Sequence, residues 1–395
     1  MADNTVYRAS TTAPVNIAVI KYWGKRDTAL NLPTNSSLSV TLSQKSLKTH
    51  TTASCSSSYT GPDTLVLNGE LEDIQSSKRT QACLQVLKRF RRDVEKKDSS
   101  LPKLSDMPLR LVSANNFPTA AGLASSAAGF AALVRAIANL YELPHSPTEL
   151  SKVARQGSGS ACRSLMGGYV AWRAGSAKDG SDSIAEEVAS VSHWPDMRAL
   201  ILVVSADKKG TPSTAGMQTT VETSTLFPTR ANEIVPKRMA AIEEAIQAKD
   251  FPTFANITMM DSNSFHAVCL DSWPPIHYLN DVSRAAMNAV ETINRRAGEP
   301  IAAYTFDAGP NAVIYYQEKD ETSVAGVFRY VLQAVGGWDG EYGAQIRPNE
   351  RGGLESKTFM TLKAGVSRVI CTGVGGGPEQ TDQHLVDVGG RPVTA

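Results

Sequence analysis

The chain has 395 residues, of which 42% are hydrophobic and 20% are charged, a composition typical of a globular protein that can bury large cores. Its 40 basic and 39 acidic residues give a formal net charge of +1, which argues against a nucleic-acid-binding surface and against a polybasic membrane anchor. This length predicts two domains of ordinary size.

The cysteines and the chain ends predict a cytoplasmic protein. The five cysteines are scattered and never spaced as C-x-x-C, which favours reduced thiols over a disulfide framework or a zinc site. The six histidines form no spaced pair, so neither a metal site nor a histidine-based triad has support. The first residues lack the basic and apolar regions of a signal peptide, and the last residues carry no targeting tripeptide.

Strands dominate the opening of the chain. The β-branched content of residues 6–25 predicts a strand that breaks near Pro14 and turns at Gly24. Further strands are predicted at 38–42, 48–53 and 64–67. Asn68-Gly69 follows the last of these and gives the strongest short-range hairpin signal in the sequence.

Helical patterns follow. Residues 76–97 form a charged amphipathic pattern, and Ser146-Pro147 has the chemistry of a helix start, with that helix running to about Gln156. After them come a predicted strand near 168–173 and a polar surface loop at 175–183.

The stretch 115–129 combines small residues, two adjacent hydroxyls and a glycine, and it runs into a helical pattern over 123–141. A turn without bulky side chains at a helix N-terminus points backbone N–H groups and a positive dipole end at one spot, which suits a phosphate. The turn matches neither Walker A nor G-x-G-x-x-G. An Ala-rich core helix is the alternative. A membrane span is disfavoured by Pro118 and the hydroxyls.

The second half mixes helices and strands after a predicted domain boundary near 193–196. A buried strand is predicted at 199–204, and a glycine-rich run occupies 373–378. Helices are predicted at 230–249, 251–267 and 282–297, and strands at 301–306, 313–316 and 367–372. Because the helices cluster rather than alternate strictly with strands, the pattern indicates an α+β organisation.

Two short segments carry candidate chemistry. Residues 157–163, Gly-Ser-Gly-Ser-Ala-Cys-Arg, place two hydroxyls near the fork of Arg163, which suits a carboxylate or a phosphate. A helix cap with a solvated arginine is the alternative, and Cys162 is expected to pack. Asp307 follows an apolar strand and could accept a hydroxyl proton. The alternative is that it only caps its own turn.

The motifs together identify a resemblance. Residues 118–128 resemble the phosphate loop of the galactokinase, homoserine kinase, mevalonate kinase and phosphomevalonate kinase (GHMP) superfamily, with Ala124 where many of its kinases have glycine. That variant resembles the mevalonate diphosphate decarboxylase family, in its eukaryotic, fungal-like branch. The other segments that resemble this family are 13–18, 21–26, 32–37, 157–163, 260–263 with Phe265-His266, and 304–311.

The resemblance implies a two-domain α+β fold with the active site in the cleft between the domains. The expected domains are 1–195, similar to ribosomal protein S5 domain 2 and carrying the phosphate loop, and 196–395, ferredoxin-like and carrying the catalytic aspartate. The implied reaction converts (R)-5-diphosphomevalonate and ATP into isopentenyl diphosphate, CO2, ADP and phosphate with Mg²⁺. The implied partners are these small molecules and a second copy of the chain in a homodimer, with no nucleic acid and no membrane.

The resemblance also implies roles for individual residues. Asp307, Arg163 and Lys21 are expected to be catalytic, with Asp307 against the C3 hydroxyl and Arg163, with Ser158, on the substrate carboxylate. The wider set of expected substrate-binding residues is Asn16, Tyr22, Trp23, Gly24, Lys25, Arg79, Ser158, Gly159, Ser160, Ala161, Cys162, Arg163, Thr214 and Asp307. The expected ATP-binding residues are Ala120, Ala121, Gly122, Leu123, Ala124, Ser125 and Ser126. The residues that bind Mg²⁺ cannot be named from the sequence.

Two other functions are compatible with this fold. The chain could be a kinase of a mevalonate-like alcohol that stops after phosphorylation, although such a kinase has no need for Arg163 to orient a carboxylate. It could also be a silent sensor of ATP and a metabolite, which the presence of Asp307, Arg163 and the serine pair disfavours.

Overall fold

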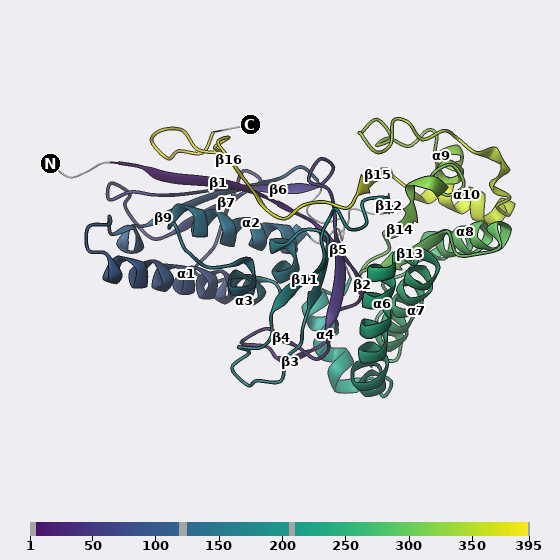
Figure 1. Ribbon diagram of the computed structural model, residues 1–395, viewed down its shortest axis with the longest axis horizontal. Coiled ribbons are helices and arrows are strands. Elements are labelled where there is room, and N and C mark those ends of the chain that lie inside the picture. The colour runs from purple at the N-terminus through teal and green to yellow at the C-terminus, as the bar shows by residue number, and fades with distance from the viewer. Residues whose placement is uncertain (1–4, 118–124, 205–209, 394–395) are drawn as a thin grey trace.

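The computed structural model describes residues 5–117, 125–204 and 210–393, and its two halves lie side by side (Figure 1). The first half contains a six-stranded sheet in the order β16-β1-β6-β9-β7-β8. Its strands are β1 (Tyr7–Pro14), β6 (Lys48–Cys55), β7 (Thr64–Leu67), β8 (Glu70–Glu72), β9 (Leu109–Asn115) and β16 (Glu379–Thr381). The predicted hairpin is confirmed, since β7 and β8 pair antiparallel and both Asn68 and Gly69 have positive φ.

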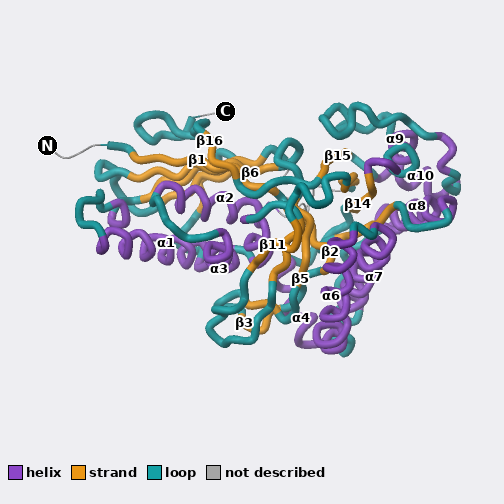
Figure 2. The backbone as a smooth tube through the Cα atoms, in the orientation of Figure 1, coloured by secondary structure: helices purple, strands orange, loops and turns teal. Residues whose placement is uncertain are grey.

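Three helices pack in the same half as this sheet (Figures 1 and 2). They are α1 (Lys78–Lys97), α2 (Ser125–Leu140) and α3 (Pro147–Gly157). Ser77 caps α1, and Ser146 caps α3 in a capping box with Glu149, which explains where these two helices begin. The apolar faces of the helices meet the sheet in one core, in which Leu87 and Ala131 are fully buried.

A second, four-stranded sheet lies between the first sheet and the other half of the chain (Figure 2). Its order is β11-β10-β5-β2, with strands β2 (Asn16–Ile20), β5 (Ser37–Thr41), β10 (Tyr169–Trp172) and β11 (Ala185–Ala189). The expected break near Pro14 is confirmed, because β1 ends there and β2 begins at Asn16 in a different sheet. The short hairpin β3 (Lys25–Asp27) and β4 (Leu32–Pro33) extends from its end.

The second half is built on the sheet β13-β14-β12-β15. Its strands are β12 (Met197–Val203), β13 (Ala302–Phe306), β14 (Ala312–Gln317) and β15 (Arg368–Gly373), and its helices are α4 (Ser213–Thr223), α5 (Phe227–Thr229), α6 (Val235–Ala248), α7 (Phe251–Leu270), α8 (Asp281–Ala297), α9 (Ala325–Val331) and α10 (Ser356–Gly365). Alternate residues of β12 enter cores on opposite faces.

One of these cores spans both halves. It joins Ile17 and Val40 of the central sheet to Phe254 of α7 and Tyr315 of β14, all of which are fully or almost fully buried. The Tyr315 hydroxyl also donates a hydrogen bond to the Ile17 carbonyl at 3.4 Å. The two halves are therefore held together by apolar packing as well as by the chain itself.

The C-terminal segment crosses back to the first half, a feature that a single division at residue 196 does not include. After β15, the glycine-rich run bonds to the central sheet, where Gly375 N–H donates to Thr41 O and Gly168 N–H donates to Gly375 O. A Cβ on Gly375 would lie 2.4 Å from the Leu42 carbonyl oxygen, so only glycine permits this approach. The chain then pairs β16 with β1.

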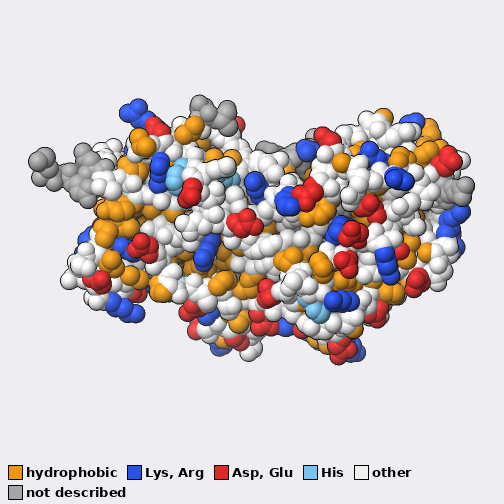
Figure 3. Space-filling view, turned by 45° about the horizontal axis from the view of Figure 1, so that its top comes forward, with side chains coloured by type: hydrophobic (Ala, Val, Ile, Leu, Met, Phe, Trp, Pro, Cys, Tyr) orange, Lys and Arg blue, Asp and Glu red, His pale blue; other side chains and the backbone are white. Residues whose placement is uncertain are grey.

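The space-filling view shows acidic and basic side chains intermixed on the visible face, with no single-sign field (Figure 3). Over the described ranges, no helix combines the length and the apolar character needed to span a bilayer.

Candidate active site

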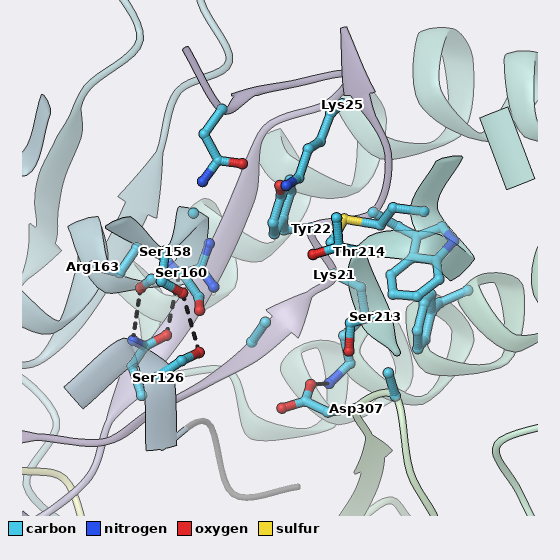
Figure 4. A pocket seen from close by; sticks show the side chains of 18 of the residues that line it. Lys21, Tyr22, Lys25, Ser126, Ser158, Ser160, Arg163, Ser213, Thr214 and Asp307 are labelled. Atoms are coloured by element: carbon cyan, nitrogen blue, oxygen red, sulfur yellow. Dashed lines mark hydrogen bonds and ion pairs between the residues drawn. The ribbon is translucent and has the colours of Figure 1, made fainter. Parts of the chain in front are cut away.

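A cavity of about 200 Å³ opens where the two halves meet, and it gathers most of the residues expected from the sequence (Figure 4). Its described lining comes from β2 and the chain after it, the starts of α1, α2 and α4, the segment after α3, helix α7, and the turn after β13. The lining residues are Asn16, Ala18, Lys21, Tyr22, Trp23, Lys25, Asn31, Arg79, Ser126, Ser158, Gly159, Ser160, Arg163, Ser213, Thr214, Met217, Phe265, Asp307 and Ala308.

An ion pair forms one wall of the cavity. Lys21 Nζ lies 2.7 Å from Asp307 Oδ1, with the lysine side chain 3% exposed and the aspartate side chain 31% exposed. Burial lowers the pKa of Lys21, and the Asp307 carboxylate opposes that shift. Lys21 Nζ donates to Asp307 Oδ1, and Asp307 also belongs to the described lining, so the carboxylate is both held by the lysine and open to the cavity. The side chain thus pairs with Lys21, and the alternative in which it only caps its own turn is wrong.

Arg163 lies across the cavity from this ion pair (Figure 4). It sits in the 3₁₀ segment Gly159–Leu165, and it is only 2% exposed, so it is not a solvated arginine. Its Nε donates to Ser39 Oγ at 3.0 Å and to Asn16 Oδ1 at 3.3 Å, and its Nη1 donates to Ser37 Oγ. These neutral acceptors orient the guanidinium without neutralising it, which leaves its charge available to an anion.

The remainder of the lining is strongly basic. Lys25 and Arg79 add to Lys21 and Arg163, so the described lining holds four basic side chains against one carboxylate. Burial, together with the charge of Arg79, lowers the pKa of Lys25, because two like charges face the same space. Hydroxyls of Ser158, Ser160, Ser213 and Thr214 accompany these charges. Such a lining suits a ligand with several negative charges.

The structure brings together most of the expected substrate-binding residues and places three of them elsewhere. Gly24, Ala161 and Cys162 are absent from the described lining. Gly24 has a φ of +85°, while Cys162 packs against Trp172 in a small apolar cluster, as its neighbours in the sequence predict. Ser126 lines the cavity and Ser125 does not, and Ala120, Ala121, Gly122, Leu123 and Ala124 lie outside the described residues.

Sequence reasoning missed several lining residues. Ser213 and Met217 belong to α4, a helix with no clear sequence signal, although Ser213 adjoins the expected Thr214. Ala308 adjoins Asp307, and Phe265 stands in a segment already singled out by resemblance. Adjacency to a named position was the available signal for Ser213 and Ala308, and resemblance to the family was the signal for Phe265. Met217 had neither.

The described residues offer little for a metal ion. Among them, no group of three or more His, Cys, Asp or Glu side chains is placed to hold one. The Asp307 carboxylate and the Ser126 hydroxyl are oxygen groups in the lining that could coordinate Mg²⁺, an ion that takes few protein ligands beside a nucleotide and is bound mainly by phosphates and water.

Comparison with known proteins gives a consistent result. Residues 13–185 match the family described as "Diphosphomevalonate decarboxylase-like N-terminal domain", and residues 199–381 match "Mevalonate 5-diphosphate decarboxylase C-terminal domain". Diphosphomevalonate decarboxylase of Aspergillus fumigatus is 67% identical over 397 residues, covering 98% of each chain.

Solved structures agree. The crystal structure of a mevalonate 5-diphosphate decarboxylase is 53% identical with a TM-score of 0.87, covering 96% of this chain and 98% of that one. A structure described as MDDEF in complex with MVAPP, AMPPCP and magnesium is 29% identical with a TM-score of 0.75, covering 96% and 100%. The expected two-domain GHMP kinase fold is confirmed by these neighbours. The chain belongs to the diphosphomevalonate decarboxylase family.

Proposed function

We propose that this chain catalyses the ATP-dependent decarboxylation of (R)-5-diphosphomevalonate to isopentenyl diphosphate, with release of CO2, ADP and phosphate. The observation that carries the proposal is the pairing of two features in one cavity, the Lys21–Asp307 ion pair and the buried Arg163. The family membership and the relative solved with MVAPP, AMPPCP and magnesium support the same substrates. ATP is then the co-substrate, used with Mg²⁺.

The reaction needs a leaving group, because a tertiary hydroxyl leaves poorly. The γ-phosphoryl group of ATP passes to the C3 oxygen, whose proton is taken by Asp307 or lost to solvent with Asp307 orienting the oxygen. Phosphate then departs with the C3–O electrons, and the bond between C2 and the carboxylate carbon supplies the electrons of the new C2=C3 double bond as CO2 leaves. Lys21 keeps Asp307 aligned for the first step through their contact of 2.7 Å.

Arg163 has the second role. Its fork, with Ser158, would hold the substrate carboxylate so that the breaking C–C bond is aligned with the departing phosphate. Release of CO2 also turns a charged carboxylate into a neutral gas, so the arginine serves for orientation more than for stabilising the product. The proposed contacts with the diphosphate end are Tyr22, Lys25, Arg79, Ser160 and Thr214, all in the lining, with Asn16 beside them.

ATP would be held by the 120–126 segment, of which Ser126 reaches the cavity and lies 3.2 Å from Ser158 Oγ. Mg²⁺ supplies charge neutralisation to the phosphates when bound. We further propose a division into domains between residues 195 and 196, which the break in the sequence pattern at 193–196 supports, and a cytoplasmic location, which the scattered cysteines support. We also propose a homodimer, which rests on resemblance to the family alone.

The test is incubation of the purified chain with diphosphomevalonate and Mg-ATP. We expect isopentenyl diphosphate and CO2 in a one-to-one ratio with ADP. Formation of ADP and a phosphorylated alcohol without CO2 would instead support a kinase that stops after phosphoryl transfer. Binding of both ligands without any product would support a sensor.

A further inference from the structure

Helix α7 carries two adjacent, fully buried polar side chains that the proposed mechanism does not use. Asp261 and Ser262 are each 0% exposed, and neither lines the described cavity. Both hydrogen-bond to backbone N–H groups outside their own helix. Polar groups buried this deeply are costly unless their partners are fixed, so the partners are informative.

The partner of Asp261 is the lysine of the ion pair. The Lys21 backbone N–H donates to Asp261 Oδ2 at 2.7 Å, and on its other side the Lys21 carbonyl accepts from Asn35 Nδ2 at 3.0 Å. Burial would raise the pKa of Asp261, but Arg230 and Arg238 keep it lowered. Arg230 donates two hydrogen bonds of 3.0 and 2.9 Å, and Arg238 donates one of 3.1 Å. Asp261 is therefore a fixed, charged acceptor for the Lys21 peptide.

The partner of Ser262 lies beside the aspartate of the ion pair. The Phe306 backbone N–H donates to Ser262 Oγ at 3.1 Å, and Asp307 is the next residue. One rigid helix thus holds, through two consecutive residues, the peptide that carries Lys21 and the peptide adjoining Asp307. Lys21 and Asp307 are 286 residues apart in sequence, and they directly follow β2 and β13, which belong to different sheets.

We infer that Asp261 and Ser262 are positioning residues that set the separation and alignment of the Lys21–Asp307 pair for phosphoryl transfer. This inference rests on the proposed function for its kinetic consequence. The geometry of a catalytic pair must be held to a fraction of an ångström, and displacements of about 1 Å can cost about a hundredfold in rate. A bond from each side of the pair to one helix provides that precision.

The decisive variant is Ser262→Ala, which removes one hydroxyl and leaves the charged network of Asp261 intact. We expect kcat to fall about tenfold, with KM for diphosphomevalonate and for ATP within twofold, because the proposed binding contacts are made by other residues. The matched control is Thr258→Val, which deletes a buried hydroxyl one turn earlier on α7 whose Oγ1 has no hydrogen-bond partner among the described residues. The kcat of Thr258→Val should stay within twofold of the wild-type value.

A second readout does not depend on activity. Hydrogen exchange followed by mass spectrometry should show faster exchange in the peptide containing Phe306 for Ser262→Ala, and for Asp261→Asn in the peptide containing Lys21, with no change in Thr258→Val. A wild-type chain that makes no isopentenyl diphosphate would refute the proposed function, while the exchange result would still test the positioning. Three kinetic results would overturn the inference in a chain whose wild type is active: an unchanged kcat in Ser262→Ala, an equal loss of kcat in Thr258→Val, or a loss in Ser262→Ala that appears in KM instead of kcat. Unchanged hydrogen exchange in the peptides containing Phe306 and Lys21 would also overturn it.

Discussion

Replacing Arg163 by lysine separates the shape of the guanidinium from its charge. The arginine uses Nε and Nη1 on Asn16, Ser39 and Ser37, so the direction of its fork is set before any ligand arrives. A lysine has a single nitrogen and cannot keep these contacts while offering two donors to a carboxylate. The Arg163→Lys variant should therefore bind the same ligands with a poorly aligned carboxylate.

The magnitude follows from the bonds lost. A hydrogen bond to a charged group is worth about 1.5–3 kcal/mol. The variant loses one of two such bonds to the substrate carboxylate, and it also loses the alignment that the bonds to Asn16, Ser39 and Ser37 provide. A loss of about 2–3 kcal/mol in the transition state corresponds to roughly a 30- to 150-fold fall in kcat/KM. This fall in kcat/KM is measured from the steady-state rates of CO2 and ADP release. We expect both products to fall together if phosphorylation and fragmentation share the same alignment.

The control is Arg155→Lys, the same change at an arginine that is 3% exposed and lies outside the described cavity lining. Its Nη1 bonds to the carbonyls of Gly180 and Ser183, so it supports a loop and not the cavity. Its kcat/KM should stay within about threefold of wild type, since its side-chain hydrogen bonds go to Gly180 and Ser183, neither of which belongs to the described lining. Wild-type kinetics in Arg163→Lys would show that this residue does not bind the substrate carboxylate. An equal loss of kcat/KM in Arg155→Lys would show that the effect is a general destabilisation of the protein.

Three further outcomes are expected. Asp307→Asn should lower turnover by about a hundredfold or more, because an amide cannot accept the hydroxyl proton, while calorimetry still detects binding of ATP and substrate; unchanged turnover would exclude the assigned role. Burial lowers the pKa of His266 from 6.5 to about 3. Below pH 6.5 the unfolded chain therefore binds a proton at this residue that the native state does not bind, and the free energy of unfolding falls as the pH falls. Urea unfolding measures how much of the free energy of unfolding is lost between pH 7 and pH 5, and this loss should be about 2 kcal/mol smaller for His266→Phe than for wild type. Identical losses in the two proteins would contradict the burial argument. Gly24→Ala should lower the melting temperature more than Gly69→Ala, since both have positive φ but only the first would place a Cβ 2.6 Å from Phe227, adding about 1–3 kcal/mol of overpacking; equal shifts would leave backbone strain as the whole cause.

Strong local signals in the sequence predicted much of the fold. The capping residue Ser146 and the Asn68-Gly69 turn fix their elements through contacts within a few residues, so they could be identified without the tertiary structure. The elements that were missed lack such signals. β11 has two glutamates in its five residues and stands at a sheet edge, and β16 is a polar three-residue strand that exists only because β1 is there to pair with it.

The candidate site was predicted unevenly for a related reason. Local reasoning suggested an anion contact for Arg163 and a proton acceptor in Asp307, and the resemblance supplied most of the remaining lining. No local pattern could place Lys21 2.7 Å from Asp307, or Asp261 against the Lys21 peptide, because these contacts depend on how α7 and two sheets pack. Helix α4 is rich in threonine, which is a weak helix former, so packing against the rest of the protein, and not local sequence, determines that this helix forms beside the cavity.

The return of the chain through the glycine run connects the two halves of the protein a second time. The polypeptide passes between its halves once before β12 and once more between β15 and β16, so two tethers connect them. A single cut in either connection would therefore leave the two halves covalently joined through the other, in addition to the buried core that they share.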